Sequence, residues 1–165
     1  MAHFAEIRSD NNEVLRVVVI SNEDVNNNGG DLSITAETWV KNNIIKDPII
    51  LKENNNTYPQ TYWKQTSYNN NFRKRYAGIE FTYDSSLDAF IPPRKHNSWI
   101  FNSDRLEWNA PIKAPSHEQK KYGNPEEENI YRIQWEEQNL RWIGFDNVNN
   151  KFIWIPSSEN WVSST

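Results

Sequence analysis

The sequence predicts a mainly β fold, a meander of short β-hairpins arranged as a sandwich or small barrel, with one short helix near residues 32–45. Two observations support this fold class. Runs of aromatic and β-branched residues alternate with polar turns rich in Asn, Asp and Ser, which is the composition of strands joined by tight turns. Aromatic residues form 13% of the chain and include 8 Trp, so rings can supply most of a thin core.

Aromatic pairs flank four of the expected turns at odd separations. An odd separation places two rings opposite each other, on one face of a hairpin with an even-numbered loop. For each Trp, the favoured interpretation is the core of the meander, and the alternative is a surface that binds sugar or a partner protein. Trp161, near the end of the sequence, is expected to be the most exposed of them. The pairs are Tyr83 and Phe90, Trp99 and Trp108, Trp135 and Trp142, and Trp154 and Trp161.

The N-terminal part of the chain is expected to begin with a β-hairpin, formed by Phe4–Arg8 and Glu13–Ile20. The polar residues 9–12 between these arms favour a turn. The second arm contains VVVI, the most apolar run of the chain, which is typical of a strand that is covered on both faces and therefore central or sandwiched. Residues 22–31 are expected to form a loop.

The one predicted helix spans residues 32–45. Ala36 and Val40 fall at helical spacing after a capping residue, Asp31 or Ser33. Because this helix is short, packing rather than intrinsic propensity must stabilise it. The remaining predicted elements are a brief strand at 49–52, a strand at Thr61–Tyr68, two strands at Gly78–Tyr83 and Asp88–Ile91, and hairpins at Trp99–Trp108, Tyr131–Ile143 and Phe152–Val162.

Composition suggests three parts along the chain. Residues 1–109 are expected to form the main β-rich domain, and residues 129–165 a set of C-terminal Trp-rich hairpins. Between them, residues 110–128 are rich in Pro and charge and are interpreted as a linker or an extended arm along a surface.

The bulk numbers exclude several function classes. The net charge of −4 and the pI of about 5.4 argue against nucleic-acid binding by the whole surface. The absence of Cys excludes disulfides and thiolate metal sites, and no apolar run approaches the roughly 18 residues of a membrane span. The N-terminus lacks a secretory signal pattern, so export by such a signal is not expected. Mean hydropathy is low, at −0.89, which predicts a protein that orders fully against a partner.

No catalytic motif stands out in the sequence. Phosphate-binding, dinucleotide-binding, hydrolase and metalloprotease motifs are absent, and none of the three His has a second ligand at metal-binding spacing. We therefore expect no enzyme activity, cofactor or metal.

The basic cluster Arg73, Lys74 and Arg75, flanked by Phe72 and Tyr76, is a candidate binding site because it combines cations with rings. The favoured alternative is a polar loop that docks on an acidic neighbour. The other candidate binding residues are Trp135, Trp142, Trp154 and Trp161.

Three segments together resemble a family of small proteins from tailed phages that infect marine cyanobacteria and related marine bacteria. They are MAHFA at the start, QTSYNNNFRKRYAGIEFTYDSSLDAFIPP in the middle, and SWIFNSDRLEWNAPIKAP after it. The match is specific over roughly Thr66 to Pro115, with the core pattern SYN-x-x-FRK-x-YAGI-x-x-TYD-x-x-x-DAFIPP. Residues 26–56 lack a Cys- and Gly-containing segment of many relatives, and the tail beyond Pro125 carries additional Trp hairpins.

The resemblance implies a phage origin and brings no catalytic residue. Together with the composition, it suggests a structural protein of the virion, either a capsid decoration or minor capsid protein or a tail or neck component. Its expected partners are other virion proteins and further copies of itself in an oligomer or symmetric array, not membranes. The alternative is a carbohydrate-binding module that recognises a host surface through the paired Trp residues.

Overall fold

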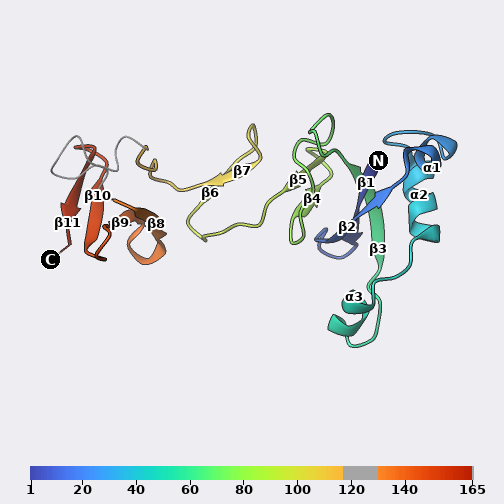
Figure 1. Ribbon diagram of the computed structural model, residues 1–165, viewed down its shortest axis with the longest axis horizontal. Helices are drawn as coiled ribbons and strands as arrows, with labels where there is room; N and C mark the ends of the chain where they lie inside the picture. Colours follow the sequence, from blue (N-terminus) through green and yellow to red (C-terminus); the bar gives the residue numbers. More distant parts are fainter. Residues whose placement is uncertain (117–129, 165) are drawn as a thin grey trace. The chain divides into compact units, whose positions relative to one another are not determined.

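The computed structural model describes residues 1–116 and 130–164, and its elements are shown in Figure 1. The chain divides into two compact units, which are described separately. The first unit comprises Met1–Pro93 and Ser103–Glu107, and the second comprises Arg94–Asn102 and Trp108–Thr165. The first unit therefore includes residues on both sides of Arg94–Asn102, and residues 117–128 of the expected linker lie outside the described residues. The mainly β class is confirmed, because several small antiparallel sheets make up most of the regular structure.

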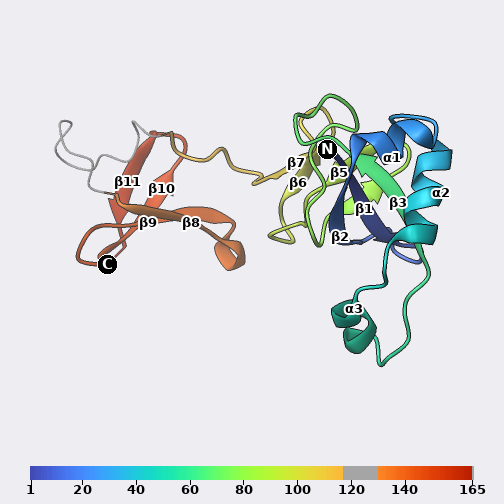
Figure 2. The same cartoon turned by 45° about the vertical axis from the view of Figure 1, so that its right-hand side comes forward.

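A three-stranded antiparallel sheet lies at the centre of the first unit, with strand order β2-β1-β3 (Figures 1 and 2). Its strands are β1 (Ala2–Arg8), β2 (Val14–Ile20) and β3 (Thr61–Thr66). The predicted hairpin is confirmed as β1–β2. The VVVI strand, expected to be central or sandwiched, is sandwiched but not central, because β1 lies between the other two strands and β2 is at an edge, where Val19 is 51% exposed. Both faces of β2 do pack, which explains its apolar sequence.

Two hydrophobic clusters cover opposite faces of this sheet, because side chains alternate along a strand. On one face Phe4 packs with helical residues Val25 and Val40. On the other face Ile7 packs with Tyr83 and Phe90. The sheet is therefore sandwiched between helices and a hairpin.

The predicted helix is confirmed as α2 (Ile34–Asn43), and the Ser33 side chain accepts hydrogen bonds from its first N–H groups. Two further helices correct the predictions. The expected loop at 22–31 contains α1 (Asn22–Asn27), and the expected strand at 49–52 is α3 (Pro48–Glu53). Both helices begin after a capping side chain, and α3 has Pro in its first turn, so local signals outweigh the apolar run in residues 49–52.

Four hairpins of one design follow β3. Each has a four-residue loop between its strands, and the last loop residue adopts a positive φ. These residues are Asp88, Leu106, Leu140 and Glu159. The hairpins are β4 (Thr82–Asp84) with β5 (Ala89–Ile91), β6 (Ile100–Asn102) with β7 (Glu107–Asn109), β8 (Arg132–Glu136) with β9 (Arg141–Phe145), and β10 (Lys151–Ile155) with β11 (Asn160–Ser163).

The aromatic pairs lie across these hairpins. One prediction is wrong: the ring that faces Trp108 belongs to Phe101, at 5.1 Å between centroids, whereas Trp99 precedes β6 and contacts Trp142. Phe101 also stands seven residues before Trp108, so all four hairpins share one aromatic spacing. The other three pairs are confirmed: Tyr83 with Phe90, Trp135 with Trp142, and Trp154 with Trp161.

The second unit contains a four-stranded antiparallel sheet with strand order β11-β10-β9-β8. Its core is formed by Ile130, Phe152, Trp154 and Trp161. Gly144 lies under this core, where a Cβ atom would stand 2.5 Å from Ile130 Cγ2 and 2.9 Å from the Trp161 ring. The glycine is therefore required by the close approach of Trp161 to strand β9.

Candidate functional site

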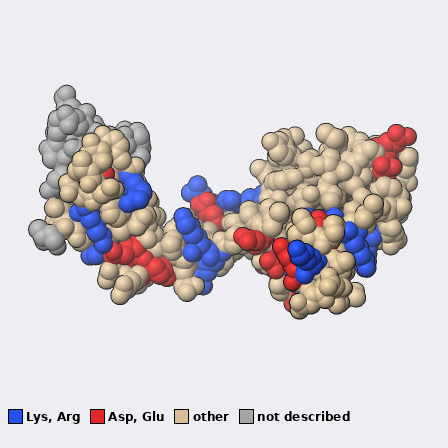
Figure 3. Space-filling model, turned by 60° about the horizontal axis from the view of Figure 1, so that its bottom comes forward, with Lys and Arg blue, Asp and Glu red and all other residues tan. Residues whose placement is uncertain are grey.

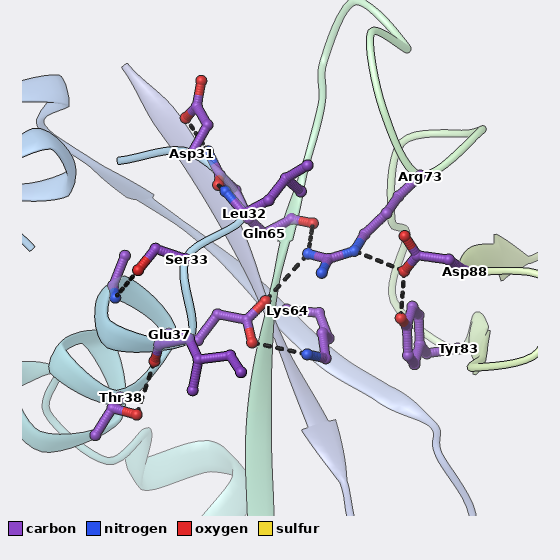
Figure 4. A network of polar contacts seen from close by, with 12 residues as sticks. Asp31, Leu32, Ser33, Glu37, Thr38, Lys64, Gln65, Arg73, Tyr83 and Asp88 are labelled. Atoms are coloured by element: carbon purple, nitrogen blue, oxygen red, sulfur yellow. Dashed lines mark hydrogen bonds and ion pairs between the residues drawn. The ribbon is translucent and has the colours of Figure 1, made fainter. Parts of the chain in front are cut away.

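Arg73 is the best-connected residue of the basic cluster, and its side chain is only 7% exposed. Its guanidinium donates to Asp88 Oδ1 at 2.8 Å, to Glu37 Oε1 at 3.1 Å and to the carbonyl oxygen of Gln65 at 2.9 Å (Figure 4). These partners come from hairpin β4–β5, helix α2 and strand β3. Arg73 thus joins three separate elements of the first unit.

Charges in this network balance. The buried Glu37 carboxylate also accepts from Lys64 Nζ at 2.7 Å, so two cations face two carboxylates. A buried carboxylate without a partner would be costly, and each oxygen of Glu37 has one cationic donor here. We interpret this arrangement as a structural tie that fixes hairpin β4–β5 against β3 and α2.

The pKa shifts of Arg73, Asp88 and Tyr83 favour the charge states that the ion pairs require. Burial lowers the pKa of Arg73, but the hydrogen bond and charge of Asp88, with the charge of Glu37, outweigh burial and raise it. Burial raises the pKa of Asp88, but hydrogen bonds from Tyr83 and Arg73 bring it below its ordinary value. Burial and the neighbouring Asp88 carboxylate raise the pKa of Tyr83, whose hydroxyl donates to Asp88. All three groups therefore keep their ordinary charge states at neutral pH.

The other two members of the basic cluster, Lys74 and Arg75, do not take part in the Arg73 network. Arg75 Nη2 lies 3.6 Å from Glu107 Oε2, and the side chain of Lys74 is exposed. The structure thus brings two of the three cations to acidic neighbours, as the favoured alternative predicted. Figure 3 shows basic and acidic side chains next to one another on the face that it draws, rather than one broad basic patch.

Three of the four candidate Trp residues are core residues. Trp135, Trp154 and Trp161 are buried, and the prediction that Trp161 is exposed is wrong, since it is 1% exposed. Trp142 is half-buried, and its indole Nε1 donates to the carbonyl oxygen of Ile112. Trp135 Nε1 donates to Glu137 Oε2 at 2.8 Å. Buried rings cannot stack on a sugar at the surface, so Trp135, Trp154 and Trp161 agree with the favoured interpretation as core residues and not with the alternative of a sugar-binding surface.

An exposed apolar strand edge is the surface feature that the sequence analysis missed. At its start, β2 is covered, because Val14 exchanges two backbone hydrogen bonds with residues 80–81. Beyond Val14, the rest of β2 has a neighbouring strand on one side only, within the described residues. The free part carries the run VVVI, and after Arg16 it contains neither a charged residue nor Pro. The VVVI run is the sequence signal of this edge, but the pattern alone predicts a central or sandwiched strand.

Comparisons with family models, curated proteins and solved structures return no match. Among residues 1–116 and 130–164, no group of three or more His, Asp or Glu side chains is placed to hold a metal ion. In the same residues, no helix has the length and apolar character to cross a bilayer.

Proposed function

We propose that this protein is a structural component of a tailed-phage particle and acts through protein–protein contacts with other virion proteins, including further copies of itself. Within the particle it serves as a capsid decoration or minor capsid protein, or as a component of the tail or neck. The resemblance of Thr66–Pro115 to phage proteins motivates the phage assignment.

The observation that carries the role in assembly is the free edge of β2. An edge strand presents unpaired N–H and C=O groups, and proteins that remain monomeric commonly protect such edges with Lys, Pro or a covering loop. The free part of β2 has no such residue after Arg16, and Val19 is 51% exposed there. A strand from a neighbouring subunit can extend the sheet at this edge, with backbone hydrogen bonds supplying affinity.

The first test is quantitative mass spectrometry of density-purified particles, with this protein counted against the major capsid protein. We expect a fixed ratio that matches either the symmetry of the capsid shell or the low copy number of tail and neck rings. Abundance in infected cells together with absence from purified particles would contradict the proposal.

A second test addresses the β2 edge itself. Val19→Lys places a charge on the exposed edge without removing a buried side chain, and should reduce incorporation into particles. The matched control is Ile34→Lys, which changes a 77% exposed side chain on helix α2. Equal incorporation of both variants would exclude the β2 edge as the contact surface.

A further inference from the structure

A polar hollow of about 210 Å³ lies in the first unit, beside the end of β2, because its lining residues Ala2 and His3 pair with Ile20 and Val19. The start of β1, the end of β3 and the following residues 67–69 and 71–72 line it, together with Asn22 and Asp31. Its lining is dominated by amides and hydroxyls, and Asp31 is the one carboxylate among the lining residues. Such a lining does not suit an apolar ligand, since desolvating polar groups without replacing their hydrogen bonds is costly.

Tyr68 provides an exposed ring at this hollow. The Tyr68 ring stacks on His3 at 6.0 Å between centroids and meets Tyr76 edge-on at 5.6 Å. His3 Nδ1 is in turn hydrogen bonded to the Tyr76 hydroxyl at 2.8 Å. Tyr68 nevertheless remains 72% exposed. Neighbouring rings therefore hold its orientation, while most of its surface stays available for stacking.

The walls supply hydrogen-bonding groups that the protein does not use. Within the described residues, the side-chain amides of Asn22, Asn69 and Asn71 have no hydrogen-bond partner. Each amide offers two donors and an acceptor with two lone pairs. Asp31 is held through one oxygen, because Gln65 Nε2 donates to Asp31 Oδ1 at 2.6 Å, as Figure 4 shows. Gln65 is itself buried, so this carboxylate has a fixed position at the hollow.

We propose that this hollow binds a neutral saccharide. Free amides and one carboxylate can pair with adjacent hydroxyl groups of a sugar, and the exposed Tyr68 ring can stack on the apolar face of a sugar ring. The Asp31 carboxylate disfavours phosphorylated or sulfated ligands through like-charge repulsion. The site does not involve the Trp pairs, and it does not depend on the proposed role in the particle.

The test is a titration of the ¹⁵N-labelled full chain with neutral sugars, followed by amide chemical shifts. The probes are the methyl glycosides of glucose, galactose, mannose and N-acetylglucosamine, and the N-acetylglucosamine trimer. We expect at least one probe to shift the amide signals of residues 67–72 and of Asp31, with a Kd of about 1 mM, which corresponds to roughly 4 kcal/mol.

Matched variants separate this site from unspecific binding. Tyr68→Ala should raise the Kd of the sugar that binds by at least about tenfold. Tyr68→Phe should leave that Kd unchanged, because it keeps the ring. Tyr131→Ala, at a comparably exposed Tyr of the second unit, should leave the affinity unchanged. Amide spectra of each variant report whether the fold is intact. The proposal is overturned if no probe shifts residues 67–72, or if the shifts persist at the same Kd in Tyr68→Ala.

Discussion

Hairpins β4–β5 and β10–β11 have the same design but are held in place by different forces. Each pairs two rings across a four-residue loop that ends in a residue with positive φ. In β4–β5 that residue is Asp88, which accepts a hydrogen bond from Arg73. In β10–β11 it is Glu159, which is exposed, and strand β10 is hydrogen bonded to strand β9.

This comparison shows that the shared hairpin sequence determines the local geometry of the two strands. The contacts that attach each hairpin to its unit are supplied by other elements. A two-stranded hairpin alone is at best marginally stable in water. β4–β5 forms its own two-stranded sheet and is tied to the first unit by ion pairs, by the packing of Tyr83 and Phe90, and by a short backbone contact in which Tyr83 N donates to the carbonyl oxygen of Asn12. β10–β11 gains its stability from sheet pairing and from the packing of Trp161. We therefore expect that removing a buried ring lowers the stability of the second unit most. In the first unit, removing a charge of the ion-pair network should also lower stability.

Trp161→Ala should produce the largest loss of stability. Removing a large aromatic side chain from a core costs about 3–5 kcal/mol, and Trp161 is 1% exposed over Gly144. Urea unfolding, followed by the amide signals of β8–β11, measures the change. The control Val162→Ala alters a half-exposed neighbour on the same strand and should stay within about 0.5 kcal/mol. Equal effects of the two changes would show that Trp161 is not a core residue.

Arg73→Met should destabilise the first unit by about 3 kcal/mol, because it leaves Glu37 buried with Lys64 as its one cationic partner and releases Asp88. Urea unfolding, followed by the amide signals of β1–β5, measures this effect. Lys74→Met, at the adjacent exposed cation, is the matched control and should be nearly neutral. If both variants unfold at the same urea concentration, the ion-pair network does not anchor β4–β5.

Hairpins were the part of the fold that the sequence predicted best. Aromatic spacing of seven residues identifies rings that face each other, because side chains alternate along both strands and the four-residue loop fixes the register. The spacing also explains the mistake at Trp99, whose separation of nine from Trp108 is odd as well. Parity alone allows both partners, and only the loop length selects Phe101.

The tertiary contacts of these elements could not be predicted from the local sequence pattern. The VVVI run predicts packing on both faces, but whether a strand is central depends on β3, which joins β1 from a distant part of the chain. Likewise, the sequence shows that Arg73 is basic but not that Glu37 and Asp88 meet it. The hollow at Tyr68 was missed for the same reason, since Asn22 and Asn69 come together only through the tertiary fold.

Acid should weaken the second unit through Glu136. This carboxylate accepts hydrogen bonds from Lys151, Asn139 and Arg141, which lower its pKa from 4.5 to about 2. Because the folded state has the lower pKa, this stabilisation is present above about pH 4.5 and is lost as the pH falls towards 2. We expect the Tm of the second unit to fall over that range, and the fall to be smaller in Glu136→Gln. Glu159→Gln, at an exposed carboxylate, should retain the full acid sensitivity of the unmodified protein.

Leu140→Gly should produce the smallest change and should increase stability. Leu140 adopts a φ of 49° at the end of the β8–β9 loop and is 47% exposed, so its side chain adds little packing. A left-handed conformation costs an L-residue about 1–2 kcal/mol, whereas the added freedom of Gly in the unfolded chain costs about 0.5–1 kcal/mol. The balance is a gain of about 0.5 kcal/mol, measurable as a higher urea midpoint. Ser158→Gly, in the β10–β11 loop at a position without positive φ, should lower the midpoint instead. A loss of stability in both variants would show that the left-handed position is not strained.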